Sequence, residues 1–322
     1  MKNEKILVSV SASFEKKEVL LSTLKKYAQR YDERFAFWDE FAFTTELLPE
    51  CDAVLVFNTP FEKIRTTCFP ENNFAFMMEP GIRWKHPWMF RGLDQYHKVY
   101  SPVQRSANTI LSHGFLGWYF QQDYNDLKKL PVPGKTKDIS CIASNLKYLK
   151  GHRRRLNFLN ILRERLPQTD LFGKGTRFLE DKMDGLLPYR YSIAIENYSS
   201  PHYFTEKIND CFLAYTVPFY YGCKNIGQYF PGKSFISIDI RDPETAIRKM
   251  EEMLLHDDWP ARLGAVKEAR ELVLNKYQPL AGAANAFRRI QTSPEKKEII
   301  LNPVPVNLLE RFAGIISKLA KL

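Results

Sequence analysis

The sequence predicts an α/β protein with two Rossmann-like domains that face a central cleft. Two observations support this class. Short apolar segments alternate with helical or irregular segments in the first half, and the same alternation starts again after a polar break near the middle. Short buried strands separated by helices are typical of parallel sheets. The length of 322 residues fits two domains of roughly 150 residues each.

The first half is expected to form an N-terminal domain over residues 1–125. A helix is predicted at residues 15–30, where apolar side chains recur on one face. Four apolar segments read as strands: Ile6–Val10, Ala53–Phe57, Phe74–Met78 and Val99–Ser101.

Residues 121–138 are polar, contain two prolines and a glycine, and are typical of a linker. A second domain is expected over residues 138–290. The most informative segment of this domain is residues 191–222, which contain a strand, a polar loop, a helix start and another strand. Further strands are expected at Asp138–Ala143, Asp170–Phe172 and Ser234–Ile238, and helices at Gly151–Leu166, 243–256 and 259–276.

The net charge of +10 and the pI near 9.2 favour anionic partners such as nucleotides, nucleic acid or acidic membrane surfaces. The five cysteines include no C-x-x-C pair, which disfavours a disulfide framework or a zinc site and favours a reducing compartment. The first apolar run is too short for a signal peptide or a membrane span. We therefore expect a cytoplasmic protein.

The loop and helix start around Thr205-Glu206-Lys207 carry the strongest functional signal. A helix N-terminus has unpaired N–H groups and a positive dipole end, which suit a phosphate. Alone, this tripeptide would be an ordinary N-cap with a solvated lysine. The preceding residues 197–203 add hydrogen-bonding and aromatic groups. A ribose needs a carboxylate or amide, and a diphosphate needs a cation, so the segment predicts a nucleotide-like ligand.

These residues also resemble a known family. Glu196-Asn197 is followed, after five residues, by Tyr203-Phe204-Thr205-Glu206-Lys207. Val217–Gly222 and Pro231–Ile236 continue the pattern, which covers mainly residues 138–240. In this spacing the chain resembles the donor-binding half of the family 10 glycosyltransferases, the α-1,3/1,4-fucosyltransferases, of bacterial type.

The resemblance implies a GT-B fold with an N-terminal acceptor-binding domain and a C-terminal domain that binds a GDP-sugar, typically GDP-fucose. It implies that Glu206 contacts the ribose or the sugar and that Lys207 meets the diphosphate. Asn197 and Tyr203 would line the donor site. Phe204 stands where the family usually has valine, and Tyr198-Ser199 replaces a commoner serine, which leaves the identity of the sugar open.

A family arginine follows a Ser-Asn pair at a strand end, and here Ser144-Asn145 leads to Arg155. The resemblance thus adds Asn145 and Arg155 to the donor site, although Arg153 and Arg154 are close alternatives. An arginine can bind a diphosphate bidentately and offset its charge as it leaves. The other reading of this basic run is an exposed helix start.

The resemblance also implies transfer with inversion at the anomeric carbon, and such a transfer needs a base that removes the proton of the acceptor hydroxyl. Glu79, after the predicted strand Phe74–Met78, stands where the family places a candidate glutamate. A strand-end salt bridge is the alternative role, and His86, His97 and His113 are competing bases. Nearby aromatic residues could stack on acceptor sugars, but ordinary core packing is favoured for each of them: Trp84, Trp88, Phe90, Trp118, Tyr119 and Phe120.

No Asp-x-Asp motif follows a predicted strand in a setting suited to a metal. Asp239 and Asp242 follow a strand but are poorly placed for a nucleotide. We therefore expect no metal site and no required cofactor, with the GDP-sugar as donor substrate. A divalent metal could at most stimulate the reaction.

Residues 305–322 have apolar side chains at helical spacing with basic residues between them, which predicts a C-terminal amphipathic helix. Such a helix can lie on a membrane surface or dock onto the body of the protein. The first reading places the chain at the cytoplasmic face of the membrane, and the resemblance to bacterial members of the family implies a lipid-linked acceptor there.

The resemblance to family 10 implies transfer of fucose, or a related sugar, to a hydroxyl of a glycan. An α-1,3 linkage on a bacterial surface oligosaccharide, such as lipopolysaccharide or capsule, is the expected product. Two alternatives stay open. One keeps the fold and mechanism with another nucleotide-sugar donor, and the other is a non-enzymatic nucleic-acid-binding protein.

Overall fold

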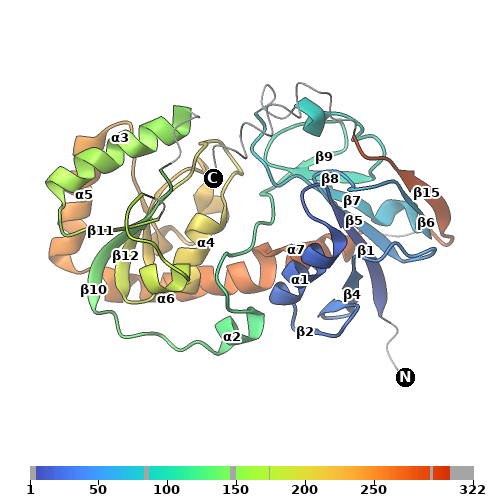
Figure 1. Ribbon diagram of the computed structural model, residues 1–322, viewed down its shortest axis with the longest axis horizontal. Helices are drawn as coiled ribbons and strands as arrows, with labels where there is room; N and C mark the ends of the chain where they lie inside the picture. The colour runs from blue at the N-terminus through green and yellow to red at the C-terminus, as the bar shows by residue number, and fades with distance from the viewer. Residues whose placement is uncertain (1–4, 83–86, 146–149, 174, 291–292, 305–322) are drawn as a thin grey trace. The chain divides into compact units, whose positions relative to one another are not determined.

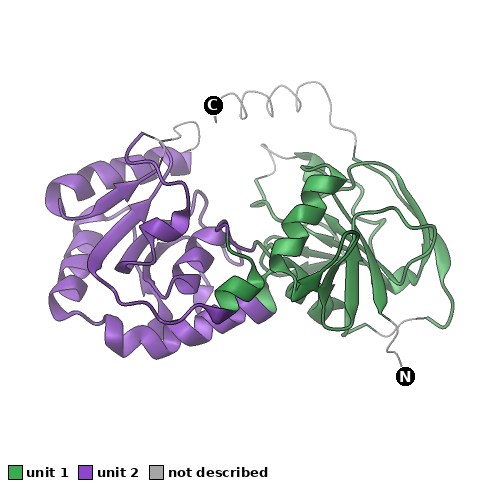
Figure 2. Cartoon of the chain, turned by 60° about the horizontal axis from the view of Figure 1, so that its bottom comes forward, with its two compact units in different colours: residues 1–116, 122–128, 276–318 green, residues 117–121, 129–275, 319–322 purple. Residues whose placement is uncertain are grey.

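The computed structural model describes residues 5–82, 87–145, 150–173, 175–290 and 293–304. The predicted helix at 305–322, Trp84 and His86 lie outside these residues. The chain forms two compact units, coloured separately in Figure 2. Unit 1 holds the described residues up to Leu116, residues 122–128 and those from Lys276 on, and unit 2 holds residues 117–121 and 129–275.

Unit 1 is built on an eight-stranded sheet of order β2-β3-β4-β1-β5-β7-β8-β9. Six strands are parallel, and β2 and β3 extend one edge in antiparallel fashion. All four predicted strands are present, whereas the antiparallel edge was not predicted. The strands are β1 (Ile6–Ala12), β2 (Arg30–Tyr31), β3 (Ala36–Trp38), β4 (Phe41–Thr44), β5 (Ala53–Phe57), β7 (Asn73–Phe76), β8 (Lys98–Ser101) and β9 (Thr109–Leu111).

Helix α1 (Lys17–Tyr27) follows β1, as the apolar periodicity predicts, and buries Leu20, Leu24 and Tyr27. Helix α7 (Pro279–Phe287) also belongs to unit 1, although the expected second domain extended to residue 290. Its buried Phe287 stacks on Phe74 of β7 with ring centroids 4.6 Å apart. The core of unit 1 therefore includes residues from both ends of the described chain.

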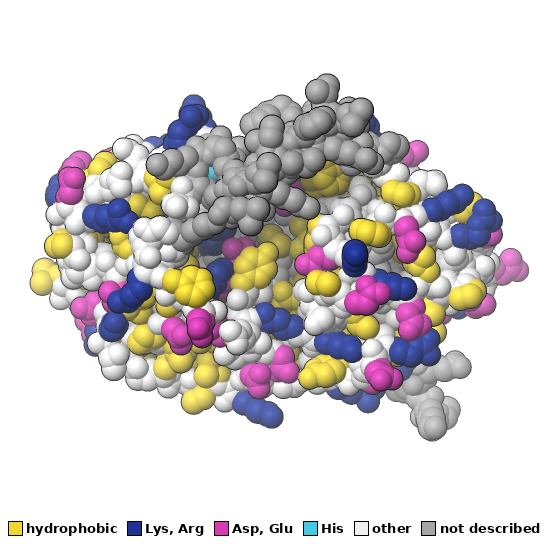
Figure 3. Space-filling view, viewed as in Figure 1, with side chains coloured by type: hydrophobic (Ala, Val, Ile, Leu, Met, Phe, Trp, Pro, Cys, Tyr) yellow, Lys and Arg dark blue, Asp and Glu magenta, His cyan; other side chains and the backbone are white. Residues whose placement is uncertain are grey.

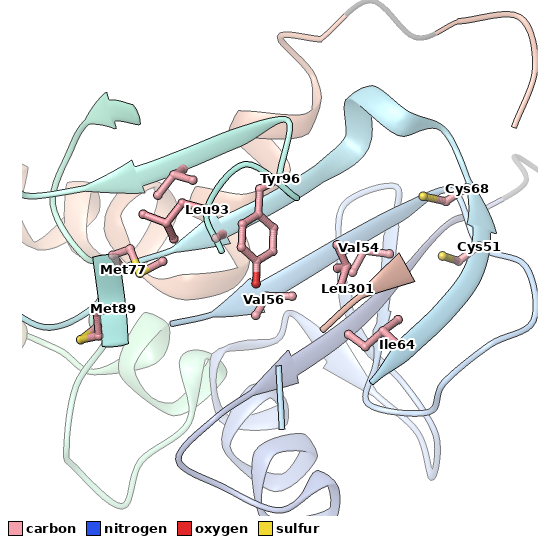
Figure 4. Packing of buried hydrophobic residues seen from close by; sticks show 12 residues of the cluster. Cys51, Val54, Val56, Ile64, Cys68, Met77, Met89, Leu93, Tyr96 and Leu301 are labelled. Atoms are coloured by element: carbon pink, nitrogen blue, oxygen red, sulfur yellow. The ribbon is translucent and has the colours of Figure 1, made fainter. Parts of the chain in front are cut away.

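A second return of the chain adds β15 (Lys297–Leu301), which pairs antiparallel with β6 (Ile64–Cys68). Figure 4 shows side chains from these two strands and from β5 converging in one buried cluster. Two 3-10 turns, η1 (Pro70–Asn72) and η2 (Pro87–Phe90), lie in the same region. The cluster comprises Cys51, Val54, Val56, Ile64, Cys68, Ala75, Met77, Met89, Leu93, Tyr96, Val99 and Leu301.

The polar segment that was predicted as a linker is divided between the units: residues 122–128 belong to unit 1, and the residues before and after them belong to unit 2. It contains a short helix, α2 (Tyr124–Lys129), and then has no regular secondary structure up to β10 (Lys137–Ile142). Lys135 holds this segment in place through three hydrogen bonds. Its ammonium donates to the carbonyls of Leu187 (2.9 Å) and Ala214 (2.7 Å) and to the hydroxyl of Thr216 (3.0 Å). The residues from Lys129 to β10 are therefore part of unit 2 and are hydrogen-bonded to the rest of it.

Unit 2 has a five-stranded parallel sheet of order β11-β10-β12-β13-β14. After β10 the chain first adds β11 on one side and then β12 on the other. Loops after such a reversal diverge and leave space for ligands at the carboxyl edge of the sheet. The strands are β10 (Lys137–Ile142), β11 (Asp170–Phe172), β12 (Tyr189–Ile195), β13 (Val217–Tyr221) and β14 (Ile236–Ser237).

Helices cover this sheet, as Figure 1 shows: α4 packs against β12, β13 and α6, and α3 packs against α5. The predicted helix at 259–276 ends earlier, because a π-helical turn, η6 (Val273–Tyr277), replaces its last residues. The helices are α3 (Lys150–Arg165), α4 (Glu206–Leu213), α5 (Pro243–His256) and α6 (Trp259–Leu272), with 3-10 turns η3 (Lys182–Gly185), η4 (Ile226–Gln228) and η5 (Gly232–Ser234).

Candidate functional site

Arg155 connects two loops at the carboxyl edge of the unit 2 sheet. Its guanidinium donates to Asn197 Oδ1 (2.5 Å), after β12, and to the Ser144 carbonyl and hydroxyl (2.8 and 3.0 Å), after β10. Arg155 is buried, Arg154 is half-buried and Arg153 is exposed. Arg155 is therefore hydrogen-bonded to Asn197, which was predicted to lie in the same site. Asn145 is exposed.

Two glycines allow the close approach of these loops. A Cβ atom on Gly151, in the first turn of α3, would lie 1.9 Å from the Asn197 carbonyl oxygen. A Cβ atom on Gly222, after β13, would lie 2.3 Å from Glu196 Cγ. Real Cβ atoms do not approach so closely, so a side chain at either position would displace the edge of the site.

Glu196, the residue directly after β12, is the buried centre of the site with a relative exposure of 1%. Its carboxylate accepts the backbone N–H of Thr205 (2.8 Å) and the Thr205 hydroxyl (2.8 Å), and it pairs with the Lys207 ammonium (3.3 Å). Burial raises the pKa of Glu196, and the charge of Lys207 opposes this rise. The sequence argument used Glu196 as part of the motif but gave it no role.

Lys207 lies among three oxygen partners. Its ammonium contacts Thr205 Oγ1 at 3.0 Å, Glu196 at 3.3 Å and Glu206 at 3.4 Å. Burial would lower the pKa of Lys207, but the two carboxylates outweigh this effect and raise it. Helix α4 begins at Glu206 with Thr205 as N-cap, as predicted. The protein's own carboxylates therefore already meet the positive end of this helix.

Glu206 is held from two sides through one oxygen. Its Oε1 lies 3.4 Å from the Lys207 ammonium and 3.7 Å from that of Lys182, in η3. Burial would raise the pKa of Glu206, but the two lysine charges outweigh it and the pKa is lowered. Glu206 is thus an ionised acceptor, which suits the hydroxyls of a ribose or a sugar.

Lys182 and Asp210 extend this network, and sequence reasoning missed both. The Lys182 ammonium lies 3.1 Å from Asp210 Oδ2, and Asp210 Oδ1 accepts the backbone N–H of Tyr119 (3.2 Å). Burial raises the pKa of Asp210 to about 6, against the charge of Lys182. Residues 119, 182 and 210 are far apart in the chain, so no local pattern could indicate their contact.

The loop before α4 is fixed by further contacts. Tyr203 is buried, and its ring meets that of Tyr198 edge-on at 6.2 Å. Ser199 donates its hydroxyl to the Gly222 carbonyl (2.7 Å), and the backbone N–H of His202 donates to Asn225 Oδ1 (2.7 Å). These contacts hold the loop against the residues that follow β13.

Five of the predicted donor-site residues lie in one region of unit 2: Asn197, Tyr203, Glu206, Lys207 and Arg155.

Glu79 lies in unit 1 after β7, and its side chain is exposed. Its carbonyl accepts from the buried Arg105 guanidinium (2.9 Å). The preceding backbone N–H, of Met78, donates to Asn58 Oδ1 (3.0 Å), which follows β5. The backbone at Glu79 is thus fixed, while its carboxylate faces solvent.

Other candidates have structural roles. His113 is buried, accepts the backbone N–H of Phe115 on Nδ1 (3.1 Å) and packs edge-on against Tyr277, so it is poorly suited as a base. Asp239 binds Arg241, and Asp242 caps α5 by accepting from Thr245 N–H (3.2 Å). Within the described part of the chain, no group of three or more His, Cys, Asp or Glu residues could hold a metal ion.

The predicted core role of the aromatic residues holds for several of them. Trp118 and Phe120 are buried, and Trp88 and Phe90 pack against the unit 1 cluster. Tyr119, in contrast, is 61% exposed. No helix among the described residues is long and apolar enough to span a bilayer.

Residues 132–258 match the family model described as "Glycosyltransferase family 10 (fucosyltransferase) C-term". This part of the chain is similar to the C-terminal domain of the family 10 glycosyltransferases. The match contains β10 to β14 with α3 and α4, and thus the whole cluster around Glu196.

Curated proteins that resemble this chain are named as fucosyltransferases. A 3-galactosyl-N-acetylglucosaminide 4-alpha-L-fucosyltransferase of Bos taurus is 25% identical over 61% of this chain and 55% of its own length. The alpha-(1,3)-fucosyltransferase of Helicobacter pylori is 29% identical over 24% of this chain and 16% of its own. The chain therefore spans about half the length of the first of these relatives.

Solved structures show the fold. An alpha1,3-fucosyltransferase crystallised with GDP aligns with a TM-score of 0.50 at 16% identity, over 85% of this chain and 92% of that one. The apo structure of OtsA aligns with a TM-score of 0.52 at 8% identity, over 90% of this chain and 100% of that one. The predicted α/β class of GT-B type is thus confirmed.

Proposed function

We propose that this chain is a glycosyltransferase that transfers fucose from GDP-fucose to a hydroxyl of a glycan acceptor. The observation that carries the proposal is the network of Glu196, Lys207 and Glu206 at the carboxyl edge of a sheet that matches family 10. A fixed, ionised carboxylate and two cationic side chains, Lys207 and Arg155, suit a ligand with both hydroxyls and a diphosphate.

Each donor residue has a separate proposed role. Glu206 accepts a hydroxyl of the ribose or the sugar, and Arg155 and Lys207 offset the charge of the leaving diphosphate. Asn197 and Tyr203 line the nucleotide sugar, and Asn145 stands at the loop after β10. Glu196 acts indirectly, because its carboxylate holds Thr205 and Lys207 in place.

In unit 1 we propose Glu79 as the base of an inverting transfer. Its exposed carboxylate on a fixed backbone can take a proton from an acceptor hydroxyl. No cofactor is required in this scheme, and a divalent metal could at most stimulate it by screening the diphosphate. The name of the Helicobacter pylori relative supports an α-1,3 linkage.

The proposed acceptor is a bacterial surface oligosaccharide, lipopolysaccharide or capsule, in lipid-linked form. The excess of basic residues and the amphipathic pattern of residues 305–322 support contact with the cytoplasmic face of a membrane. Transfer assays with soluble and vesicle-bound acceptors would test this location.

Two alternatives have distinct tests. Another nucleotide sugar would use the same network, so transfer should be compared for GDP-fucose, GDP-mannose and UDP-sugars. A nucleic-acid-binding protein would need a basic stripe, whereas basic and acidic side chains are interspersed on the described surface visible in Figure 3. Thermal stabilisation by GDP, without stabilisation by a DNA oligomer, would support the enzyme.

The decisive variants are Glu206→Gln and Lys207→Met, which remove one charge each with little change in volume. We expect each to lower transfer from GDP-fucose by at least about 100-fold, because the lost charge faces the donor. Lys249→Met, at an exposed lysine of α5, is the matched control and should retain activity. Circular dichroism would check folding. Full activity in both site variants would disprove the proposal.

A further inference from the structure

Helix α4 places two acids one turn apart on the same face. Glu206 and Asp210 stand at positions i and i+4, where like charges repel each other. The Lys182 ammonium, from η3, lies 3.7 Å from Glu206 Oε1 and 3.1 Å from Asp210 Oδ2. A cation from a distant segment thus bridges the two carboxylates and offsets their repulsion.

Asp210 in turn fixes Lys182. Its side chain is only 3% exposed, and a buried carboxylate is stable only with partners. Those partners are the Lys182 ammonium and the Tyr119 N–H, and the Tyr119 ring lies 4.9 Å from the same ammonium. Lys182 is therefore held by a buried anion and an aromatic face at one defined place.

The consequence falls on Glu206. Lys182 and Lys207 both lie near Glu206 Oε1, at 3.7 and 3.4 Å. Two cations beside this oxygen restrain the position of the carboxylate. They also keep it ionised, because their charges lower its pKa.

We propose that Lys182 and Asp210 are positioning residues, which hold Glu206 so that its carboxylate accepts a hydroxyl of the nucleotide sugar. This inference rests on the proposed function and extends it to two residues that the motif does not contain. Neither residue needs to touch the donor itself. Their effect reaches the ligand through the orientation and charge of Glu206.

The test is a calorimetric titration of the full chain with GDP-fucose. Lys182→Met and Asp210→Asn should each raise the Kd by about 10-fold to 100-fold, the range expected for a misplaced charged hydrogen bond. Lys182→Arg keeps the charge and should recover most of the affinity. Lys137→Met removes an exposed lysine paired with Asp170 (3.1 Å) at the start of β10 and should bind as wild type.

The pH dependence separates positioning from a merely structural role. The charged and titratable groups around Asp210 are Lys182 of η3, Glu206, Lys207 and Cys211 of α4, and Tyr119. The pKa of Asp210 is raised to about 6, so its protonation below that pH frees Lys182. The wild-type Kd should therefore rise as the pH falls through about 6. The Kd of Asp210→Asn should be raised both above and below this pH.

The outcomes distinguish the two proposals. A wild-type chain that binds no GDP-fucose would overturn the proposed function. Normal wild-type binding beside an unchanged Kd in Lys182→Met, or an acid response retained in Asp210→Asn, would overturn this inference alone. If Lys182→Met fails to fold, Asp210→Asn and Lys182→Arg carry the test, since the first is isosteric and the second retains the charge.

Discussion

At the carboxyl edge of the unit 2 sheet the charged side chains are buried and paired, whereas in unit 1 the candidate base is exposed. Glu196 and Asp210 have almost no accessible surface and each is bound to a lysine. Glu79 has an exposed side chain, and only its backbone is fixed, through Arg105. In unit 2 the ion pairs hold the charged groups themselves in place. In unit 1 only the backbone of Glu79 is held, and its carboxylate is exposed.

This difference has energetic consequences. Removing one partner of a buried ion pair leaves an uncompensated charge in a poorly hydrated place, so it affects stability as well as activity. Removing an exposed carboxylate leaves nothing unpaired inside the protein. A conservative variant at the unit 1 candidate base should therefore change activity without changing stability. A conservative variant at a buried charge of unit 2 should change both.

The largest expected effect is on activity in unit 1. Glu79→Gln should lower the transfer rate about 10²-fold to 10⁴-fold, the contribution of a general base. The melting temperature should not change, because the side chain is exposed. Glu62→Gln, at another exposed glutamate of unit 1, should alter neither property. Equal activity of Glu79→Gln and wild type would remove Glu79 from the mechanism.

The next effect is on stability in unit 2. Glu196→Gln leaves Lys207 with a weaker partner in a buried setting and should lower the free energy of unfolding by about 3–5 kcal/mol. Glu298→Gln breaks the exposed pair with Arg65 (2.9 Å) and should change it by at most about 1 kcal/mol. Urea denaturation measures both. Similar losses of unfolding free energy in the two variants would contradict the expected difference between a buried and an exposed ion pair.

The smallest effect sharpens the geometry of the buried edge. Gly222→Ala places a methyl group 2.3 Å from Glu196 Cγ and should lower the free energy of unfolding by about 1–3 kcal/mol through overpacking. Gly264→Ala, in helix α6 with no atom within 4 Å of the new Cβ, should raise it by up to about 1 kcal/mol. Effects of the same sign at both glycines would show that the close approach does not constrain the site.

Local pattern was enough for much of the fold. The strands at 53–57 and 170–172 and the helix at 243–256 lie where the sequence pattern predicts them. The pairing of β6 with β15 and the inclusion of α7 in unit 1 were not predicted. Both depend on contacts between residues more than 200 positions apart, which hydrophobic periodicity does not encode.

The same limit applies to the site. Thr205, Glu206 and Lys207 could be found because a helix start and a family motif coincide within a few residues. The role of Glu196 could have been inferred from its place directly after a strand and nine residues before Thr205. Lys182, Asp210 and Tyr119 belong to three separate segments and meet only in the folded unit.

The central claim is that GDP-fucose binds at the carboxyl edge of the unit 2 sheet, and hydrogen–deuterium exchange of the full chain tests it most directly. Added GDP-fucose should slow amide exchange in residues 196–207, where Asn197, Tyr203, Glu206 and Lys207 would meet the donor. Unchanged exchange in this segment at saturating GDP-fucose, with or without slowing elsewhere, would contradict the account.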